Sequence, residues 1–297
     1  MPDYYGRPTA VLKNAFLRLE YLSNAGPRIV RLFAGDSDFN LLAEMPDFSI
    51  PTPYGDYHFT GGHRLWHSPE AMPRTYVPDD QGLEVQELED GVRLVQPVEG
   101  PTSIQKTLEI HLHPNEAAIT LHHRLENAGM WPVELAPWAI TQLQHGGVAI
   151  VPQQRRDDPR NLLLPDRLLA IWSYTVLSDP RLHLADDYVL VDGNAAQPPC
   201  KVGLLNKRGW AGYLNRGILL LKRFSLRFDG PLPDYGVNTE VYVDHRFIEL
   251  ETLGPMTTLQ PGQWVGHTET WELTSGIDVP QTLDGVRELA RRLGLSS

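Results

Sequence analysis

The 297-residue sequence has little cysteine, no excess of basic residues and no long apolar run. Its single cysteine, Cys200, excludes an internal disulfide and a cysteine-rich zinc site. A formal net charge of −11 argues against a general nucleic-acid-binding protein, because that task needs clustered Lys and Arg. No window approaches the ~18 apolar residues of a membrane-spanning helix. Met1–Asn14 is polar and has no apolar stretch of signal-peptide length, so we expect a cytoplasmic protein.

The motifs of several enzyme classes are also missing. The sequence contains no glycine-rich loop ending in Gly-Lys-Ser/Thr, no Gly-x-Ser-x-Gly elbow and no His-Glu-x-x-His. His111 and His113 are two apart on an expected strand and would share a face, but two histidines alone are a weak metal signal. We therefore expect no cofactor and no bound metal.

What the sequence does have is many short segments in which apolar and polar residues alternate. This period of two is typical of strands, and the 25 Gly and 25 Pro supply turns between them. So many strands indicate an all-β sandwich or barrel. The predicted strands are Ala15–Leu22, Gly26–Phe33, Leu83–Leu88, Gly91–Pro97, Ile104–Leu112, Ala117–Glu126, Val133–Leu143, Val148–Val151, Val202–Leu205, Trp210–Leu214, Ile218–Phe228, Glu240–Asp244, Phe247–Leu253 and Trp264–Leu273.

One helix is expected, at the end of the chain. Thr282 follows Pro280 and can cap it, and apolar residues then recur at helical spacing up to Leu293. Residues 151–169 are less regular and are expected to form a surface excursion. With no repeat or linker present, we expect one β-domain over residues 1–279 and a helix over 280–297 packed on or beside it.

Three segments carry the residues that could do chemistry. The first is Gly61–Glu70, expected to be a loop that presents His63, Arg64 and Trp66 to a ligand. The alternative is a purely structural loop in which Arg64 pairs with Glu70.

The second segment is the pair of strands around Glu240 and Phe247–Leu253. On the later strand Glu249 and Glu251 share one face, and Glu240 lies on the matching face of the earlier strand. Carboxylates this close raise at least one pKa, as a general acid or base near neutral pH requires. The alternative is a solvated face with salt bridges.

The third segment comprises Leu121–Asn127 and its continuation Trp131–Gly147. His123 and His122 point to opposite faces, so at most one of them can face a given site. Further along, Trp138 and Gln142 share a face, and an aromatic ring beside an amide suits a sugar. His145 could project from the strand end into the same cleft.

These segments resemble the galactose-mutarotase-like superfamily, and most closely an aldose-epimerase-like bacterial branch of it. The resemblance extends over most of residues 10–275. It rests on Gly61–Trp66, Leu135–Ala139, Asn238–Tyr242, Leu250–Pro255 and, near the end, Pro261-Gly262 with His267–Trp271. It implies a β-supersandwich of two large antiparallel sheets with a sugar cleft on a concave surface.

The resemblance also implies roles for individual residues. Aldose 1-epimerases use a glutamate as base and a histidine as acid, and Glu251 matches the glutamate, while Arg64 matches a binding arginine. The family's acid histidine falls near Pro137–Thr141, where this sequence has none. His145 and His123 are the candidates to replace it.

The sequence therefore predicts a protein that binds a sugar or oligosaccharide, acting as an aldose 1-epimerase-type isomerase. The alternative is a non-catalytic carbohydrate-binding or regulatory protein that has lost the acid. Two further functions are less favoured. One is a structural partner domain that docks through its C-terminal helix, and the other is a lyase or other sugar chemistry on the same fold. A monomer or a homodimer is expected.

Overall fold

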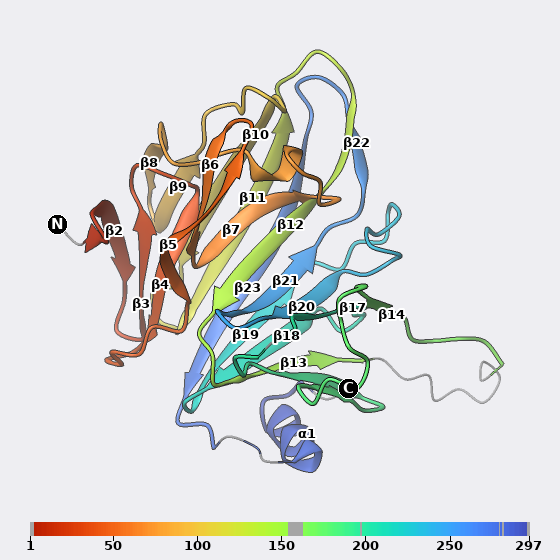
Figure 1. Ribbon diagram of the computed structural model, residues 1–297. Helices are drawn as coiled ribbons and strands as arrows, with labels where there is room; N and C mark the ends of the chain where they lie inside the picture. Colours follow the sequence, from red (N-terminus) through yellow and green to blue (C-terminus); the bar gives the residue numbers. More distant parts are fainter. Residues whose placement is uncertain (1–2, 154–162, 197, 279, 281, 296–297) are drawn as a thin grey trace.

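Two large antiparallel sheets, one of 11 strands and one of 10, form most of the molecule and pack face to face (Figure 1). The computed structural model describes residues 3–153, 163–196, 198–278, 280 and 282–295. This architecture confirms the predicted all-β class, and each of the 14 predicted strands overlaps an observed one. Among the described residues, no helix has the length and apolar character needed to cross a membrane.

The first sheet contains the strands that carry most of the predicted site residues. Its order is β1-β2-β3-β4-β7-β12-β21-β20-β17-β14, and β22 pairs with β12 beside this path. The bounds are β1 Asp3–Tyr4, β2 Arg7–Lys13, β3 Leu17–Leu22, β4 Arg28–Ala34, β7 His63–Ser68, β12 Val133–Leu143, β21 Ile248–Leu253, β20 Thr239–Val243, β17 Cys200–Leu204, β14 Leu169–Ile171 and β22 Thr257–Leu259.

The second sheet forms the opposite layer. Its order is β15-β16-β13-β18-β19-β23-β11-β10-β9-β8, and a small separate sheet pairs β5 with β6. The bounds are β15 Leu182–Leu184, β16 Tyr188–Asp192, β13 Val148–Pro152, β18 Trp210–Asn215, β19 Ile218–Phe224, β23 Trp264–Ser275, β11 Ala118–Asn127, β10 Ile104–Leu112, β9 Gly91–Val95, β8 Glu84–Leu88, β5 Glu44–Thr52 and β6 Gly55–Gly61; a short 3₁₀ helix, η1, covers Arg74–Tyr76.

The main core lies between the two large sheets. Along each strand, alternate side chains point into it, so Ile248 and Leu250 of β21 meet Leu108 and Leu220 of the second sheet in one buried cluster. Burying such a side chain contributes about 1.5–3 kcal/mol. The other face of β21 is thereby left for polar residues.

The C-terminal helix α1 (Leu283–Arg292) packs on the outer face of the second sheet (Figure 1). The Thr282 side chain accepts a hydrogen bond from the Gly285 amide at 3.2 Å and caps the helix. Val286, Leu289 and Ala290 are buried against Trp210 and other apolar residues of β13, β16, β18 and β19. The predicted helix, its cap and its apolar stripe are confirmed.

The segment 61–70 differs from its predicted loop, because residues 63–68 form the central strand β7. All six residues are buried, since the strand is covered on both faces and pairs with β4 and β12. Gly62 has φ +70, and a Cβ there would lie 1.9 Å from the Ile29 carbonyl oxygen, so only glycine fits at the strand entrance. Polar residues on both faces hide the strand period from sequence reasoning.

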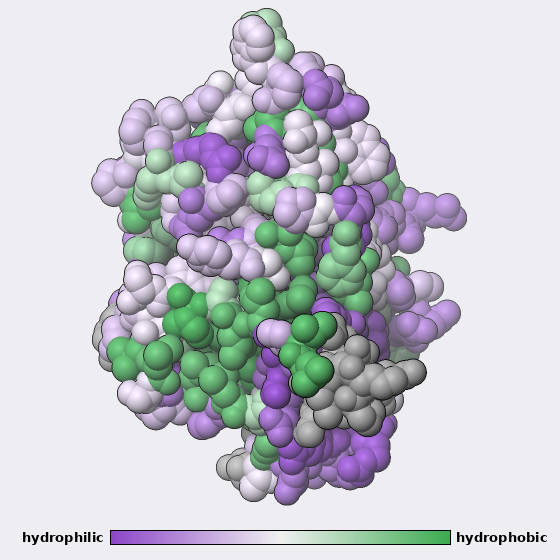
Figure 2. Space-filling model, turned by 90° about the vertical axis from the view of Figure 1, so that its right-hand side faces the viewer, coloured by the Kyte–Doolittle hydropathy of each residue, from purple (hydrophilic) through white to green (hydrophobic). Residues whose placement is uncertain are grey.

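Several other strands were not predicted, among them the three-residue strands β14 and β15. They lie at the ends of the two sheets, where apolar side chains are exposed instead of buried. Figure 2 shows green apolar surface there beside the grey residues. The predicted excursion 151–169 falls partly on residues 154–162, which lie outside the described residues. The exposed apolar side chains are Leu163, Leu164, Leu169, Ile171, Val176, Leu177 and Leu184.

Candidate functional site

A cleft of about 280 Å³ opens on the outer face of the first sheet, over β7, β12, β21, β20 and β17. The small β5–β6 sheet and η1 supply further walls. Aromatic side chains dominate the lining, and five charged residues stand among them. The aromatic residues are Phe48, Phe59, Trp66, Tyr76, Trp138, Tyr174, Tyr242 and Phe247, and the charged residues are Arg64, Glu70, Lys201, Arg246 and Glu249.

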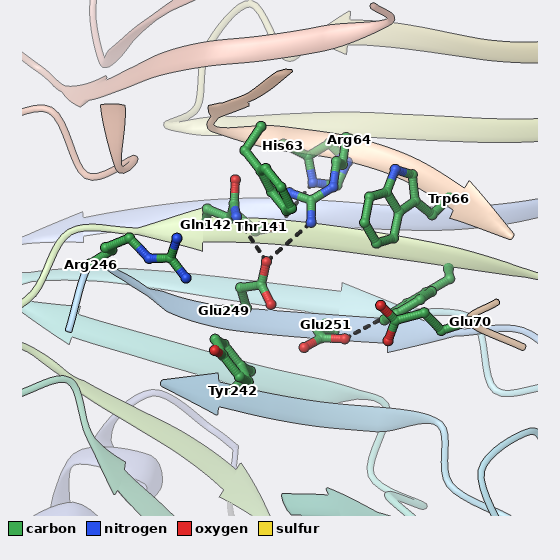
Figure 3. A network of polar contacts seen from close by, with 12 residues as sticks. His63, Arg64, Trp66, Glu70, Thr141, Gln142, Tyr242, Arg246, Glu249 and Glu251 are labelled. Atoms are coloured by element: carbon green, nitrogen blue, oxygen red, sulfur yellow. Dashed lines mark hydrogen bonds and ion pairs between the residues drawn. The ribbon is translucent and has the colours of Figure 1, made fainter. Parts of the chain in front are cut away.

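Glu249 is the titratable carboxyl group that lines the cleft from β21. Its Oε1 accepts hydrogen bonds from Arg64 Nη2 at 3.2 Å and from Gln142 Nε2 at 2.9 Å (Figure 3). Burial raises the pKa of Glu249 to about 7, with a further contribution from the charge of Glu251, while Arg64 and Lys201 act in the opposite direction. The Glu249 carboxyl group is therefore able to gain or lose a proton near neutral pH.

Glu251 shares the cleft face of β21, as predicted, but lies deeper. Its side chain is fully buried and is not part of the cleft lining. Oε2 accepts hydrogen bonds from Trp138 Nε1 at 2.6 Å and from Lys201 Nζ at 3.1 Å. The structure thus brings Glu251 together with Trp138, one of its predicted neighbours, beneath the floor of the cleft.

Lys201 of β17 is a site residue that sequence reasoning missed. Its ammonium lies 2.7 Å from Glu240 Oε2 and 3.1 Å from Glu251 Oε2. Burial raises the pKa of Glu240 well above its ordinary value, while the Lys201 ammonium acts in the opposite direction. A lysine inside the otherwise apolar segment Cys200–Leu204 was the available signal, because a buried lysine needs a partner.

Arg64 and the two tryptophans form the upper wall. The Arg64 guanidinium carbon lies 4.3 Å from the Trp66 ring centroid, and the Trp66 and Trp138 rings are 5.5 Å apart at 70°. Arg64 is 2% exposed, and within the described part of the chain its Nε and Nη1 have no hydrogen-bond partner. A guanidinium in a cleft wall with two nitrogens that lack a hydrogen-bond partner is suited to acceptor oxygens of a ligand.

The predicted site histidines His63, His123 and His145 do not line the cleft, so the prediction that they contact a ligand there is wrong. His63 lies one residue before Arg64 on β7, so its ring points to the opposite face, between the sheets. His123 belongs to β11 of the second sheet, and its ring meets that of His63. His145 follows β12, and its Nδ1 donates to the Gly193 carbonyl at 2.6 Å. In the described part of the chain, no histidine lines the cleft.

A buried polar network fills the space behind the cleft, between the two sheets. Lys222 Nζ pairs with Glu269 Oε1 at 2.9 Å and donates to Thr141 Oγ1 at 2.9 Å and to the Leu250 carbonyl at 3.0 Å. The indole of Trp271 donates to the second Glu269 oxygen at 2.8 Å. These contacts use the three donors of Lys222 and both oxygens of Glu269.

Hydrogen bonds also fix the proton positions on the histidines of this network. His123 Nδ1 donates to the His267 carbonyl at 3.0 Å, so its Nε2 accepts from His63 Nε2 at 2.7 Å. His63 Nδ1 then accepts from Thr141 Oγ1 at 2.9 Å. Burial is the main cause that lowers the pKa of both rings, which are therefore neutral.

Three of these groups could in principle hold a metal ion. One ligand atom each from His63, His123 and Glu269 lies within 4.8 Å of the others. The ring nitrogens are hydrogen-bonded to each other, and Glu269 is paired with the Lys222 ammonium. A cation would have to displace that ammonium, so the donor set fits a hydrogen-bonded network better than a metal site.

Neither a protein-family model nor a curated protein sequence matches the chain. Solved structures do match its fold. A TPR-domain-containing protein from Parabacteroides distasonis matches over 93% of this chain and 50% of its own, with a TM-score of 0.64 and 13% identity. It thus spans half of that protein.

Two further matches span the whole of the compared chain. A galactose mutarotase related enzyme from Lactobacillus acidophilus matches over 93% of this chain and 100% of its own, with a TM-score of 0.52 and 8% identity. The aldose epimerase homologue from C. elegans matches over 92% and 100%, with a TM-score of 0.53 and 10% identity. The chain therefore has the galactose-mutarotase-like β-supersandwich fold that its sequence motifs predicted.

Proposed function

We propose that this protein binds a sugar in the cleft and interconverts its anomers, as an aldose 1-epimerase does, with Glu249 as the acid–base group. The observation that carries the proposal is the Glu249 carboxyl group, which lines an aromatic cleft and has a pKa of about 7. Efficient proton transfer requires a pKa near the working pH. The sequence-based prediction placed this role on Glu251, which is fully buried.

The walls of the cleft suit a sugar ring. The C–H face of a sugar packs on an aromatic ring, and Trp66 and Trp138 are among the aromatic residues that line the cleft. The Arg64 N–H groups that lack partners among the described residues would donate to sugar oxygens. Gln142 is fully buried and would act as a positioning residue, because it donates to Glu249 at 2.9 Å.

The reaction requires that a proton be removed from the anomeric hydroxyl and that a proton be added to the ring oxygen. Glu249 would remove the proton of the anomeric hydroxyl as the bond between the anomeric carbon and the ring oxygen breaks, which gives an open-chain aldehyde and a hydroxyl at the former ring oxygen. Both oxygens are attached to the same carbon, so one carboxyl group near both can accept the first proton and return one to the ring oxygen. Arg64 and Gln142 both bond to Oε1, so we assign the exchange to Oε2. The Lys201 ammonium in the cleft wall would stabilise negative charge that develops.

The test compares Glu249→Gln and Glu251→Gln with the wild type in anomer interconversion, measured by NMR on a panel of aldoses. We expect Glu249→Gln to lower the rate by ~10²–10⁴-fold, the range of a general acid–base contribution, with sugar affinity changed only a few-fold. Glu272→Gln is the matched control, because Glu272 lies on the second sheet and is partly exposed. A loss confined to Glu251→Gln would instead support the base predicted from the sequence.

A second candidate function is sugar binding without turnover. It is favoured by the position of the histidines, because none of those in the described residues lines the cleft. It predicts saturable binding in calorimetry with no anomer interconversion above that of the buffer. The same NMR panel therefore separates the two functions.

A further inference from the structure

A second hollow, of about 320 Å³, adjoins the cleft. The two share Glu70, Tyr76, Trp138 and Lys201 as walls, so the second hollow lies next to the cleft at these side chains. Each volume alone is near the lower limit of ~300–1,000 Å³ for small-ligand pockets, and the two together fall within that range. The combined space suits a ligand longer than one sugar ring.

The second hollow has its own aromatic face. Lys201 Nζ lies 4.9 Å from the Trp138 ring centroid and 4.7 Å from that of Trp172, so the ammonium lies over both indole rings. Trp172 lines only the second hollow, whereas Glu249 lines only the first. Each compartment therefore combines aromatic surface with polar groups, as the binding of a sugar unit requires.

The charges of the second hollow favour a neutral unit. Glu70 and Asp234 line it, and both are acidic. Lys201 is its only cationic lining residue in the described chain, and Glu251 and Glu240 lie within 3.1 Å of the ammonium. A carboxylated or phosphorylated unit would face two carboxylates without an unmatched cation, whereas sugar hydroxyls can donate to them.

We infer that the ligand is an oligosaccharide of at least two units, with its reducing end beside Glu249 and a neutral second unit against Trp172. This inference rests on the proposed function, which places the anomeric hydroxyl at Glu249. Trp172 is then a specificity-determining residue that contacts the second unit and not the first.

The experiment measures the Kd of matched sugars by calorimetry: glucose with maltose and cellobiose, mannose with mannobiose, and galactose with galactobiose. We expect at least one disaccharide to bind about tenfold more tightly than its monosaccharide, as one aromatic contact provides. In Trp172→Ala this difference should fall below about twofold, with the monosaccharide Kd unchanged. Trp131→Ala is the matched control, because Trp131 is 77% exposed and lines neither compartment.

A second variant guards against a folding defect in Trp172→Ala. Asp234 has φ +47, a conformation that Asn tolerates, so Asp234→Asn keeps the backbone and removes one acceptor charge. It should weaken disaccharides and not monosaccharides. Equal affinity within every pair, or an equal effect of Trp172→Ala on both members, would overturn the inference. Turnover of monosaccharides alone would also overturn the oligosaccharide inference, but it would leave the proposed function intact. If the protein bound none of these sugars, both the inference and the proposed function would be overturned.

Discussion

The two faces of the strands β7, β12 and β21 carry polar side chains of opposite character. On the inner face, His63, Thr141 and Thr252 belong to a network that lies between the sheets. On the outer face, their neighbours Arg64 and Gln142 have side-chain atoms without a hydrogen-bond partner in the described residues, and the same is true of Glu251. Residues that are neighbours in the sequence thus lie in two different environments, the space between the sheets and the cleft side of the first sheet.

The difference separates polar groups whose hydrogen bonds are all made from buried groups that keep unused hydrogen-bonding capacity. Buried polar groups that are fully hydrogen-bonded fix one arrangement, whereas each buried group left without a partner costs about 1–3 kcal/mol. The inner network contributes no unsatisfied side-chain atom among the described residues. Among the unpaired atoms of these strands, those of Arg64, Gln142 and Glu251 lie on the cleft side, whereas both ring nitrogens of His67 lie on the inner face of β7, outside the network.

The largest expected effect would break the inner network. Lys222→Met removes the partner of Glu269, whose side chain is fully buried, and should lower the free energy of unfolding by about 3–5 kcal/mol, measured by urea denaturation. The matched control is Arg223→Met on the same strand, because the Arg223–Glu272 pair is 44% and 38% exposed. That variant should change stability by no more than about 0.5 kcal/mol. Equal losses in the two variants would contradict the comparison.

A smaller effect is expected from Thr141→Val, which keeps the side-chain shape. It removes the hydroxyl that links Lys222 to His63, and one unsatisfied buried group costs about 1–3 kcal/mol of unfolding free energy. Thr258→Val on the exposed face of β22 is the control and should be neutral. Because Thr141 faces away from the cleft, sugar affinity should stay the same; a loss of affinity as large as that of stability would show that the two faces are coupled.

The smallest expected effect is on the pH dependence of the interconversion rate, and it tests only the outer face of the sheet. A base must be ionised, so with a Glu249 pKa of about 7 the interconversion rate should rise with pH and reach half its maximum near pH 7. Below that pH it should fall about tenfold per unit, or ~1.4 kcal/mol. Arg64→Met removes a charge that favours the carboxylate and should move the midpoint to higher pH. Thr141→Val should leave it in place, and a midpoint that stays near pH 4.5 would exclude Glu249.

The same pKa shift has a consequence for stability. Burial raises the pKa of Glu249 from 4.5 to about 7, so the folded protein holds a proton that the unfolded chain has released between these values. Ionisation of Glu249 therefore lowers stability as the pH rises through this window. Glu249→Gln should remove that contribution.

Much of the fold followed from local pattern. Alternation predicted the strands Val133–Leu143 and Phe247–Leu253, observed as Val133–Leu143 and Ile248–Leu253, and capping with apolar spacing predicted the helix after Thr282. The paired glycines and the polar residues of segment 61–70 predict a loop, but pairing with β4 and β12 makes residues 63–68 a strand. Of the candidate residues taken from the sequence, Arg64, Trp66, Trp138 and Glu249 line one cleft.

The sequence by itself determined which side chains share a face, because a strand has a period of two wherever it lies. Only the tertiary structure decided which face opens to a ligand and which carboxyl group is accessible there. Lys201 reaches Glu251 from 50 positions away in the chain, and His63 meets His123 across the space between two sheets. Burial and neighbouring charge set a pKa, and both depend on strands that are distant in sequence, so the contrast between Glu249 and Glu251 had no local signal.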